Sequence, residues 1–374
     1  VALLEHVEFT VETHEDNLTI TVPFWRSDIH IPEDVIEEVG RIGGFDSITP
    51  TLPMRDFTAV SPSSFDTFRT SLRKMLVRAG ANEVLTYSFV HGDMLQKVGQ
   101  ITEDSYRVTN SISPDLQYYR QSLTPSLLQL IHPNVKNGFD SFAVFELNKV
   151  HPRQRGITDE EVPDEANALA LTLTKNKKVG SGEPYYDAKR ILDFLAAHVG
   201  LTLRYEPLKQ EVAYPTAKPF EYRRSAVVID ESTGIPIGMV GEYRKAVAKN
   251  FKLSGHVAGF ELDIDAMFKA AEQSETEYSP LSRYPSTERD VCFQVATTIT
   301  YDEIVRAING SVTDTLQTVV SPIDIYQAES NDTKNITVRI KLTPFDRTLT
   351  NQEITDSINA LVDAVKSATH ANVI

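Results

Sequence analysis

The sequence predicts an α+β protein made of three segments. In the middle of the chain, strand-like runs mostly follow one another with helices interspersed, which is typical of a largely antiparallel sheet. In the last segment, strands and helices follow in the order βαββαβ, which is typical of the ferredoxin-like arrangement. A polar run between them, Ala270–Pro280, is rich in Glu, Ser and Gln and is expected to be a linker.

The first segment, residues 1–56, is predicted to contain a strand followed by a helix. Leu18–Val22 alternates apolar and polar residues, as a half-buried strand does. Pro32 suits the first turn of a helix, and Gly43-Gly44 is expected to end it. At about 100° per residue, one face of that helix collects four apolar side chains: Val35, Ile36, Val39 and Ile42.

The middle segment, residues 57–269, opens with a predicted helix, Phe65–Ala79, which Gly80 closes. Three further helices are expected at Thr124–Val135, Asp187–Val199 and Arg244–Asn250. Seven runs have the composition of strands: Val84–Val90, Leu116–Gln121, Phe142–Val150, Leu169–Thr174, Ala226–Ile229, Pro236–Gly241 and Val257–Leu262.

The last segment, residues 281–374, has the clearest pattern of elements. Thr350 and Glu353 form a capping box, which fixes the start of a helix that runs to Ser367. The other predicted elements are strands at Arg289–Val295, Leu316–Tyr326, Asn335–Leu342 and Ala371–Ile374, and a helix at Tyr301–Asn309.

Composition limits the classes of function. The chain has 374 residues, of which 41% are hydrophobic and 24% charged, as in ordinary globular proteins. No run approaches the roughly 18–20 apolar residues of a membrane span, so no membrane partner is expected. The first residues, Val-Ala-Leu-Leu-Glu, are neither an initiator Met nor a leader, so the chain is expected to begin inside a longer protein. Cys292 is the only cysteine, which fits a reducing, cytoplasmic location.

The net charge is strongly negative. It is −15 for the chain, and residues 1–56 alone contribute −9 from 12 acidic and 3 basic side chains. Salt-driven binding to nucleic acid needs clustered Lys and Arg, so we expect no DNA partner. Any contact with RNA must come from local patches.

An acidic cluster in the first segment is the best local candidate for a metal site. Asp34 and Glu38 are four residues apart on the predicted helix, Glu37 lies beside them, and Asp28 precedes the helix. Ligands that are all oxygen, without His or Cys nearby, suit Mg²⁺. The alternative is structural and is favoured by the residues alone: acids in the first turns complement the helix dipole, and Arg41 can pair with Glu37 or Glu38.

The residues around this cluster carry a resemblance to a known family. Val22-Pro-Phe-Trp-Arg26, Asp28, Glu33–Val39 and Gly44-Phe-Asp46 resemble the metal-binding domain of bacterial phenylalanyl-tRNA synthetase β subunits, with only the second half of that domain represented. The resemblance implies that four carboxylates bind Mg²⁺ at the boundary with the α subunit: Asp28, Asp34, Glu37 and Glu38.

The middle segment continues the resemblance. Tyr87-Ser-Phe89, Arg120-Gln-Ser-Leu-Thr-Pro125 and Val144-Phe-Glu-Leu147 resemble the catalytic-like domain of the same subunit, which has a class II synthetase-like fold and is not expected to catalyse adenylation. Arg120 and Arg244 are the candidates for remnants of an ATP site. Gln121 and Ser122 break the expected Arg-x-Glu pairing, so packing of the sheet is the favoured interpretation. The alternative is a free-standing, ATP-using enzyme.

The last segment resembles the ferredoxin-fold anticodon-binding domain that closes bacterial β subunits. The matching residues are Ser282-Arg-Tyr-Pro-Ser286, Arg289-Asp290, Asp324-Ile-Tyr326, Arg347-Thr-Leu-Thr350 and Glu353. Aromatic and basic side chains on such a sheet suit unpaired bases. The candidates are Arg283, Tyr284, Tyr326, Arg339 and Lys341. A purely structural role for these turns carries equal weight.

The resemblance spans nearly the whole chain, in the family's own order. It implies a non-catalytic part of a phenylalanine–tRNA ligase that assembles with α subunits as α₂β₂ and helps to bind tRNA(Phe). ATP, phenylalanine and the chemical step would belong to the α subunit, and the family's editing domain is absent from this sequence. Besides the free-standing enzyme, the second alternative is an assembly scaffold that makes no contact with RNA.

Overall fold

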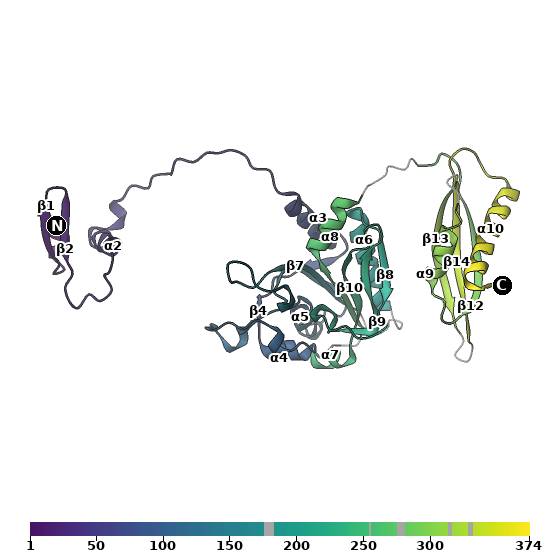
Figure 1. Ribbon diagram of the computed structural model, residues 1–374, viewed down its shortest axis with the longest axis horizontal. Helices are drawn as coiled ribbons and strands as arrows, with labels where there is room; N and C mark the ends of the chain where they lie inside the picture. The colour runs from purple at the N-terminus through teal and green to yellow at the C-terminus, as the bar shows by residue number, and fades with distance from the viewer. Residues whose placement is uncertain (176–182, 254–255, 275–280, 313–315, 328–331) are drawn as a thin grey trace. The chain divides into compact units, whose positions relative to one another are not determined.

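A computed structural model describes residues 1–175, 183–253, 256–274, 281–312, 316–327 and 332–374 (Figure 1). The chain divides into two compact units, Val1–Lys74 and Met75–Ile374. Within the described residues, no helix is both long and apolar enough to cross a membrane. Mixed helices and sheets in both units confirm the predicted α+β class.

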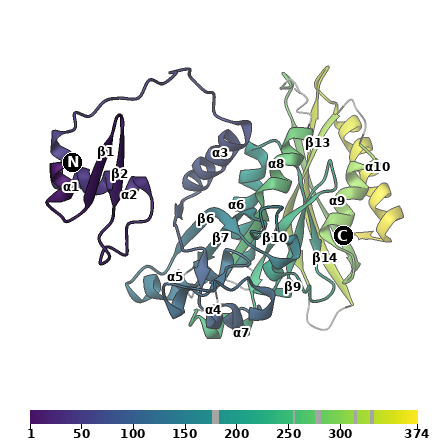
Figure 2. The same ribbon diagram turned by 60° about the vertical axis from the view of Figure 1, so that its left-hand side comes forward.

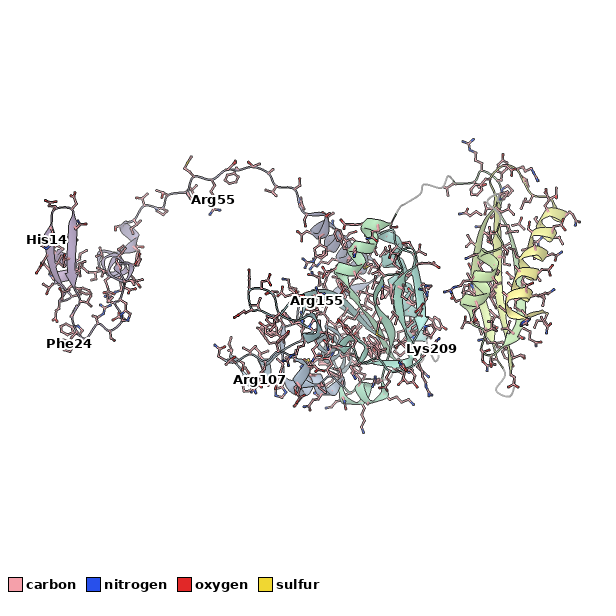
Figure 3. All side chains as sticks on the ribbon, viewed as in Figure 1. His14, Phe24, Arg55, Arg107, Arg155 and Lys209 are labelled. Carbon is pink, nitrogen blue, oxygen red and sulfur yellow. The ribbon has the colours of Figure 1, made fainter. Side chains whose placement is uncertain are left out.

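The first unit is built around a hairpin and a helix. After the short helix α1 (Ala2–Glu5), strands β1 (Thr10–His14) and β2 (Asn17–Thr21) pair antiparallel, and α2 (Pro32–Gly43) follows. The predicted strand and helix are therefore confirmed, with β1 as an unpredicted partner. Beyond a short 3-10 turn, Phe45–Ser47, residues 48–63 have no regular secondary structure. Figure 3 labels Arg55 on this extended segment.

A seven-stranded sheet forms the middle of the second unit. Its strands are ordered β3-β6-β7-β11-β10-β9-β8, and every neighbouring pair is antiparallel except β3 and β6. Their bounds are β3 Ala81–Glu83, β6 Phe142–Val150, β7 Ala166–Thr174, β8 Leu203–Pro207, β9 Phe220–Asp230, β10 Pro236–Tyr243 and β11 Val257–Asp263. This arrangement confirms the largely antiparallel sheet.

Helices bury both faces of this sheet. Alternation along β7 sends Ala166, Ala168 and Ala170 to one face, where they share a core with Leu123, Leu127 and Ile131 at α5 (Thr124–Lys136). Alternate leucines of β7, Leu169, Leu171 and Leu173, are equally buried and face the other way. Helices α6 (Glu183–His198) and α8 (Ile264–Gln273) also contact β7. The sheet therefore has no open face at its centre.

Most predicted elements of the middle segment are confirmed, with four differences. Helices α3 (Ser64–Arg78) and α7 (Lys245–Asn250) lie where expected. The single strand predicted at Val84–Val90 is wrong, because β3 ends before it at Glu83 and residues 84–88 form no strand. Only Phe89–Val90 do so, as β4, which pairs with β5 (Tyr118–Tyr119). Helix α4 (Gly92–Lys97) and strand β8 were not predicted. Ala270–Gln273 belong to α8 rather than to a linker, and residues 275–280 of that run lie outside the described residues.

The C-terminal part of the second unit confirms the βαββαβ order. Four strands form an antiparallel sheet ordered β13-β14-β12-β15, and α9 and α10 share a buried core with it (Figure 2). The elements are β12 Thr287–Ala296, α9 Tyr301–Asn309, β13 Leu316–Tyr326, β14 Thr333–Pro344, α10 Asn351–Thr369 and β15 Asn372–Val373. The predicted capping box at Thr350 and Glu353 is present. The buried side chains of β14 alternate with more exposed ones, so the sheet has one helix-covered face and one open face.

Candidate nucleic-acid interface and carboxylate cluster

The open face of the C-terminal sheet holds three of the five residues predicted to bind RNA. Arg339 and Lys341 lie two apart on β14, between the buried Val338, Ile340 and Leu342, so both point to the open face. Tyr326 is 62% exposed and lies opposite Asn335. Asn335 is four residues before Arg339 on β14, so its side chain and that of Tyr326 are on the same face as Arg339. Tyr326 is on this face because the bulge at Pro322–Asp324 shifts the register of β13 by one residue.

The other two predicted residues lie at the far end of the same strand. Arg283 and Tyr284 are in the turn before β12, and the Ser282 hydroxyl in that turn donates to the carbonyl oxygen of Pro344. Asn335 and Pro344 are nine residues apart on β14, or about 30 Å at the rise of a strand. The five residues therefore follow a strip along the sheet and do not form one cluster.

Acidic side chains share this strip, which the sequence alone did not indicate. The Arg339 guanidinium donates two hydrogen bonds to the Asp290 carboxylate across β12 and β14, both 2.8 Å. These bonds lower the pKa of Asp290 and raise that of Arg339. Lys341 lies opposite Glu288. The face is thus a mixed-charge surface on which the arginine already has a carboxylate partner.

In the first unit, the four predicted metal ligands face different partners. Arg26 donates two hydrogen bonds to Asp28, with Nε–Oδ1 of 2.9 Å and Nη2–Oδ2 of 2.7 Å, and one from Nη1 to Glu38 Oε2 at 3.0 Å. Arg41 also donates to Glu38, which is buried on α2. The hydrogen bonds from Arg26 and Arg41 lower the pKa of Glu38 to about 2.

Asp34 and Glu37 stand apart from that pair. The Asp34 carboxylate accepts the backbone N–H groups of His30 and Ile31, at 2.7 and 3.0 Å, and these bonds lower its pKa. It therefore satisfies donors at the start of α2, as the structural alternative requires. Glu37 is exposed. Among the described residues, no three His, Cys, Asp or Glu side chains are grouped to hold a metal ion, so as arranged these carboxylates do not fit Mg²⁺.

The candidate ATP remnant, Arg120, follows β5 and belongs to a buried network against β6 of the central sheet. Its side chain is 1% exposed and its Nη1 donates to Glu146 Oε1 and Thr86 Oγ1, at 3.1 and 2.8 Å. Glu146 also accepts from the side chain of Asn148. The guanidinium is thus buried inside the fold, as the packing interpretation predicts, although its Nη2 group has no hydrogen-bond partner among the described residues.

An apolar pocket on this sheet offers no alternative site for phosphates. It measures about 390 Å³ and is lined by parts of β7, β9, β10 and β11. Glu261 lines it, but the carboxylate accepts the backbone N–H groups of Leu123 and Thr124 at the start of α5. Burial raises the pKa of Glu261. Within the described chain, no Lys or Arg lines this pocket.

Family models match the chain in three consecutive stretches. The phenylalanyl tRNA synthetase beta chain CLM domain matches residues 48–264. The tRNA synthetase B5 domain matches residues 1–45, and the ferredoxin-fold anticodon binding domain matches residues 282–373.

Similar curated proteins bear the name phenylalanine–tRNA ligase beta subunit. Those of Symbiobacterium thermophilum and Desulfotalea psychrophila are each 28% identical, over 94% and 96% of this chain, and that of Xanthomonas campestris is 29% identical over 96%. The match covers 39%, 46% and 44% of those proteins, so this chain spans less than half of their length.

Two solved structures also overlap with the chain. A pyrrolysyl tRNA synthetase from Desulfitobacterium hafniense has a TM-score of 0.42 and 14% identity, over 58% of this chain and 74% of that one. A prolyl-tRNA synthetase from Giardia lamblia, solved with prolyl-adenylate, has a TM-score of 0.42 and 7% identity, over 55% and 44%.

Proposed function

The chain belongs to the phenylalanyl-tRNA synthetase β-chain family, and from that premise we propose that it serves a phenylalanine–tRNA ligase as a non-catalytic part of the β subunit. It assembles with α subunits, as α₂β₂, and binds tRNA(Phe) during ATP-dependent aminoacylation. The observation that carries the proposal is the agreement of three family models, in order, from residue 1 to residue 373. The proposed domains are residues 1–56, 57–269 and 281–374, in a cytoplasmic protein without a DNA or membrane partner.

The catalytic step is assigned to the α subunit. Transfer of an adenylyl group requires cations that hold the phosphates of ATP. Arg120 is buried against Glu146, and among the described residues no Lys or Arg lines the apolar pocket beside Glu261, which argues against a free-standing, ATP-using enzyme. ATP and phenylalanine are therefore expected to bind the partner.

The open face of the C-terminal sheet is the proposed contact with tRNA. Tyr326 offers a ring on which an unpaired base can stack, and Arg339 and Lys341 lie on the same face. Arg283 and Tyr284 would extend this contact toward the other end of β14.

The experiment that tests the assignment measures aminoacylation of tRNA(Phe) by a matching α subunit, alone and with the full-length β subunit. We expect activity to require β. A Tyr326→Ala variant of β should lose tRNA affinity while still assembling with α, whereas an assembly scaffold without RNA contact would keep its affinity. If β makes no difference and this chain alone turns over ATP, the assignment fails.

Mg²⁺ binding at Asp28, Asp34, Glu37 and Glu38 stays a separate proposal. The resemblance supports this ligand set, and the hydrogen bonds of Arg26 oppose it, because Arg26 would have to release Asp28 and Glu38. Glu37 is the variant to use, since its carboxylate is exposed and the other three have structural partners. Calorimetric titration of Mg²⁺ into the α–β complex should lose a site in Glu37→Gln. Glu33→Gln, exposed one turn earlier on α2, is the matched control.

A further inference from the structure

Strands β8 and β9 pair at one edge of the central sheet (Figure 1), and the residues that line a second pocket lie at this edge. Its volume is about 390 Å³, within the range of small-ligand sites. It combines two tyrosines of α6 with two arginines of β9. The full lining is Tyr185, Tyr186, Pro207, Arg223, Arg224, Ser225, Ala226 and Glu242. None of these belongs to the sites described above.

One side of the pocket is aromatic. The rings of Tyr185 and Tyr186 meet edge to face, with centroids 5.4 Å apart and planes at 83°. Tyr185 is partly buried, and its burial raises the pKa to about 12, so its hydroxyl is neutral at physiological pH. Tyr186 is 64% exposed. Tyr185 therefore packs against Tyr186 and holds its ring in place. The exposed Tyr186 ring is available for a second flat ring to stack on.

The other side of the pocket is cationic. Arg223 donates from Nε to the Tyr222 hydroxyl at 2.7 Å and lies over that ring, 5.4 Å from its centroid. Within the described chain, no hydrogen bond or ion pair is found for its two terminal amino groups. Arg224 pairs with Glu242 through Nη1 and Oε2 at 2.7 Å. Among the described residues that line the pocket, Arg224 therefore has a carboxylate partner and Arg223 has none.

We propose that this pocket binds a nucleotide, with the base against Tyr186 and the phosphate at Arg223. A stacking ring beside a guanidinium with free donors is the combination that recognises a base and its phosphate together. An acidic peptide would need only the arginines and would leave the tyrosines unused. The chemistry suits a free nucleotide and a nucleotide within single-stranded RNA equally. The inference does not rest on the proposed function, because the pocket lies apart from the C-terminal sheet in sequence and in residues.

The test is calorimetric titration of the full chain with AMP, with adenosine and with inorganic phosphate. We expect AMP to bind more tightly than either of its halves. Tyr186→Ala and Arg223→Ala should each weaken AMP binding by about tenfold, the scale of one lost stacking or charge-assisted contact. Arg190→Ala is the matched control, because Arg190 is also exposed on α6 but lies outside the pocket.

A gain of affinity separates binding from a merely structural role. Glu242→Gln removes the one carboxylate of the pocket and releases Arg224, so AMP should bind severalfold more tightly. A loss of packing cannot produce that increase. Circular dichroism melts of every variant show whether the chain still folds.

A short oligoadenylate separates the two sources of the nucleotide. If it binds more tightly than AMP and loses affinity in Arg223→Ala, the pocket contacts RNA. If AMP binds and the oligoadenylate does not, the pocket takes a free nucleotide. The proposal is overturned if neither probe binds, or if binding is unchanged in Tyr186→Ala, Arg223→Ala and Glu242→Gln together.

Discussion

Two pairs of arginine and carboxylate in the second unit differ in what surrounds them. Arg120 follows β5 and pairs with Glu146 on β6 of the central sheet, whereas Arg339 and Asp290 lie on β14 and β12 of the C-terminal sheet. Arg120 and Glu146 lie under helices, with side chains 1% and 0% exposed. Arg339 and Asp290 lie on a face without helices, with side chains 44% and 46% exposed. The same chemistry is therefore enclosed in one sheet and open to a partner in the other.

This difference separates structural from functional roles. A guanidinium that its own fold buries cannot reach a ligand, and it would lose its compensating charge if its partner were removed. An exposed pair gains little stability from its own attraction, because water screens it and both side chains lose freedom. We therefore expect changes at Arg120 to act on folding, and changes at Arg339 to act on binding.

Replacing Arg120 should give the largest loss of stability among the variants that test this comparison. Arg120→Met should destabilise the second unit by about 3–5 kcal/mol, because Glu146 would stay buried without its cationic partner. Urea unfolding measures the loss, and hydrogen exchange of the β6 amides assigns it to the central sheet. Adding Glu146→Gln should recover part of the loss. Arg107→Met, at an exposed arginine, is the control. Unchanged stability, with loss of ATP binding by this chain, would restore the free-standing enzyme.

A substitution in the closely packed central strands should give the next largest loss of stability. A Cβ atom at Gly259 would lie 2.2 Å from the carbonyl oxygen of Leu171 and 2.3 Å from the Tyr243 hydroxyl. Gly259→Ala must therefore push β11 from β7, at about 1–3 kcal/mol. Thermal unfolding measures it. Ser321→Ala on the exposed side of β13 should leave the melting temperature within error. An equal shift of the melting temperature in Gly259→Ala and Ser321→Ala would mean that the central sheet is packed no more tightly than the exposed side of β13.

Much of this contrast could be predicted from the sequence. The βαββαβ order, the capping box and the strands β6, β13 and β14 follow from local patterns of two and 3.6 residues, which the chain obeys closely there. The strand predicted at Val84–Val90 failed because local pattern does not decide which residues find a partner strand. The central sheet takes Ala81–Glu83, just before the run, and within the run only Phe89–Val90 pair, with β5. Likewise, α8, which Asp263 caps at its start, extends to Gln273, inside the run Ala270–Pro280 that its composition marked as a linker.

The candidate sites show the same limit. Parity along β14 suggests that Arg339 and Lys341 share a face, but it does not reveal which strand lies opposite. The partners Asp290 and Glu288 follow from the register of β12, and Tyr326 reaches the open face only through a bulge. In the acidic cluster, helical spacing placed Asp34 beside Glu38. The spacing gave no sign that Arg26, twelve residues before Glu38, would fold back and bind it.

The helix layer of the open sheet provides a smaller test. Thr350→Ala removes the side-chain acceptor for the Glu353 N–H and should cost about 1 kcal/mol. Hydrogen bonds from Arg347 and Thr350 lower the pKa of Glu353 to about 2 in the folded state, from 4.5. Its stabilisation is therefore complete above about pH 4.5 and is lost as the pH falls toward 2.

Melting curves of the wild type and Thr350→Ala at pH 6 and pH 3 measure both effects. The wild type should lose more stability between these two values than Thr350→Ala does. Thr355→Ala, one turn later on α10, is the control, because its hydroxyl only donates to the carbonyl oxygen of Asn351. Equal losses in all three proteins would show that the capping box does not govern the acid sensitivity of this helix.

The exposed pair should change stability least and binding most clearly. Asp290→Asn removes the charge that holds Arg339, and Arg339→Ala removes the cation itself. Both variants should melt with the wild type. In a filter-binding titration of the α–β complex with tRNA(Phe), Asp290→Asn should bind severalfold more tightly and Arg339→Ala more weakly, because only the first frees a donor for phosphate. Glu353 is unsuitable as a control because it caps α10, whereas Asp363→Asn, exposed on the same helix, changes the net charge equally. If Asp363→Asn and Asp290→Asn raise the affinity for tRNA(Phe) by the same factor, the change in net charge explains the gain. The proposal that the open face contacts tRNA would then be wrong.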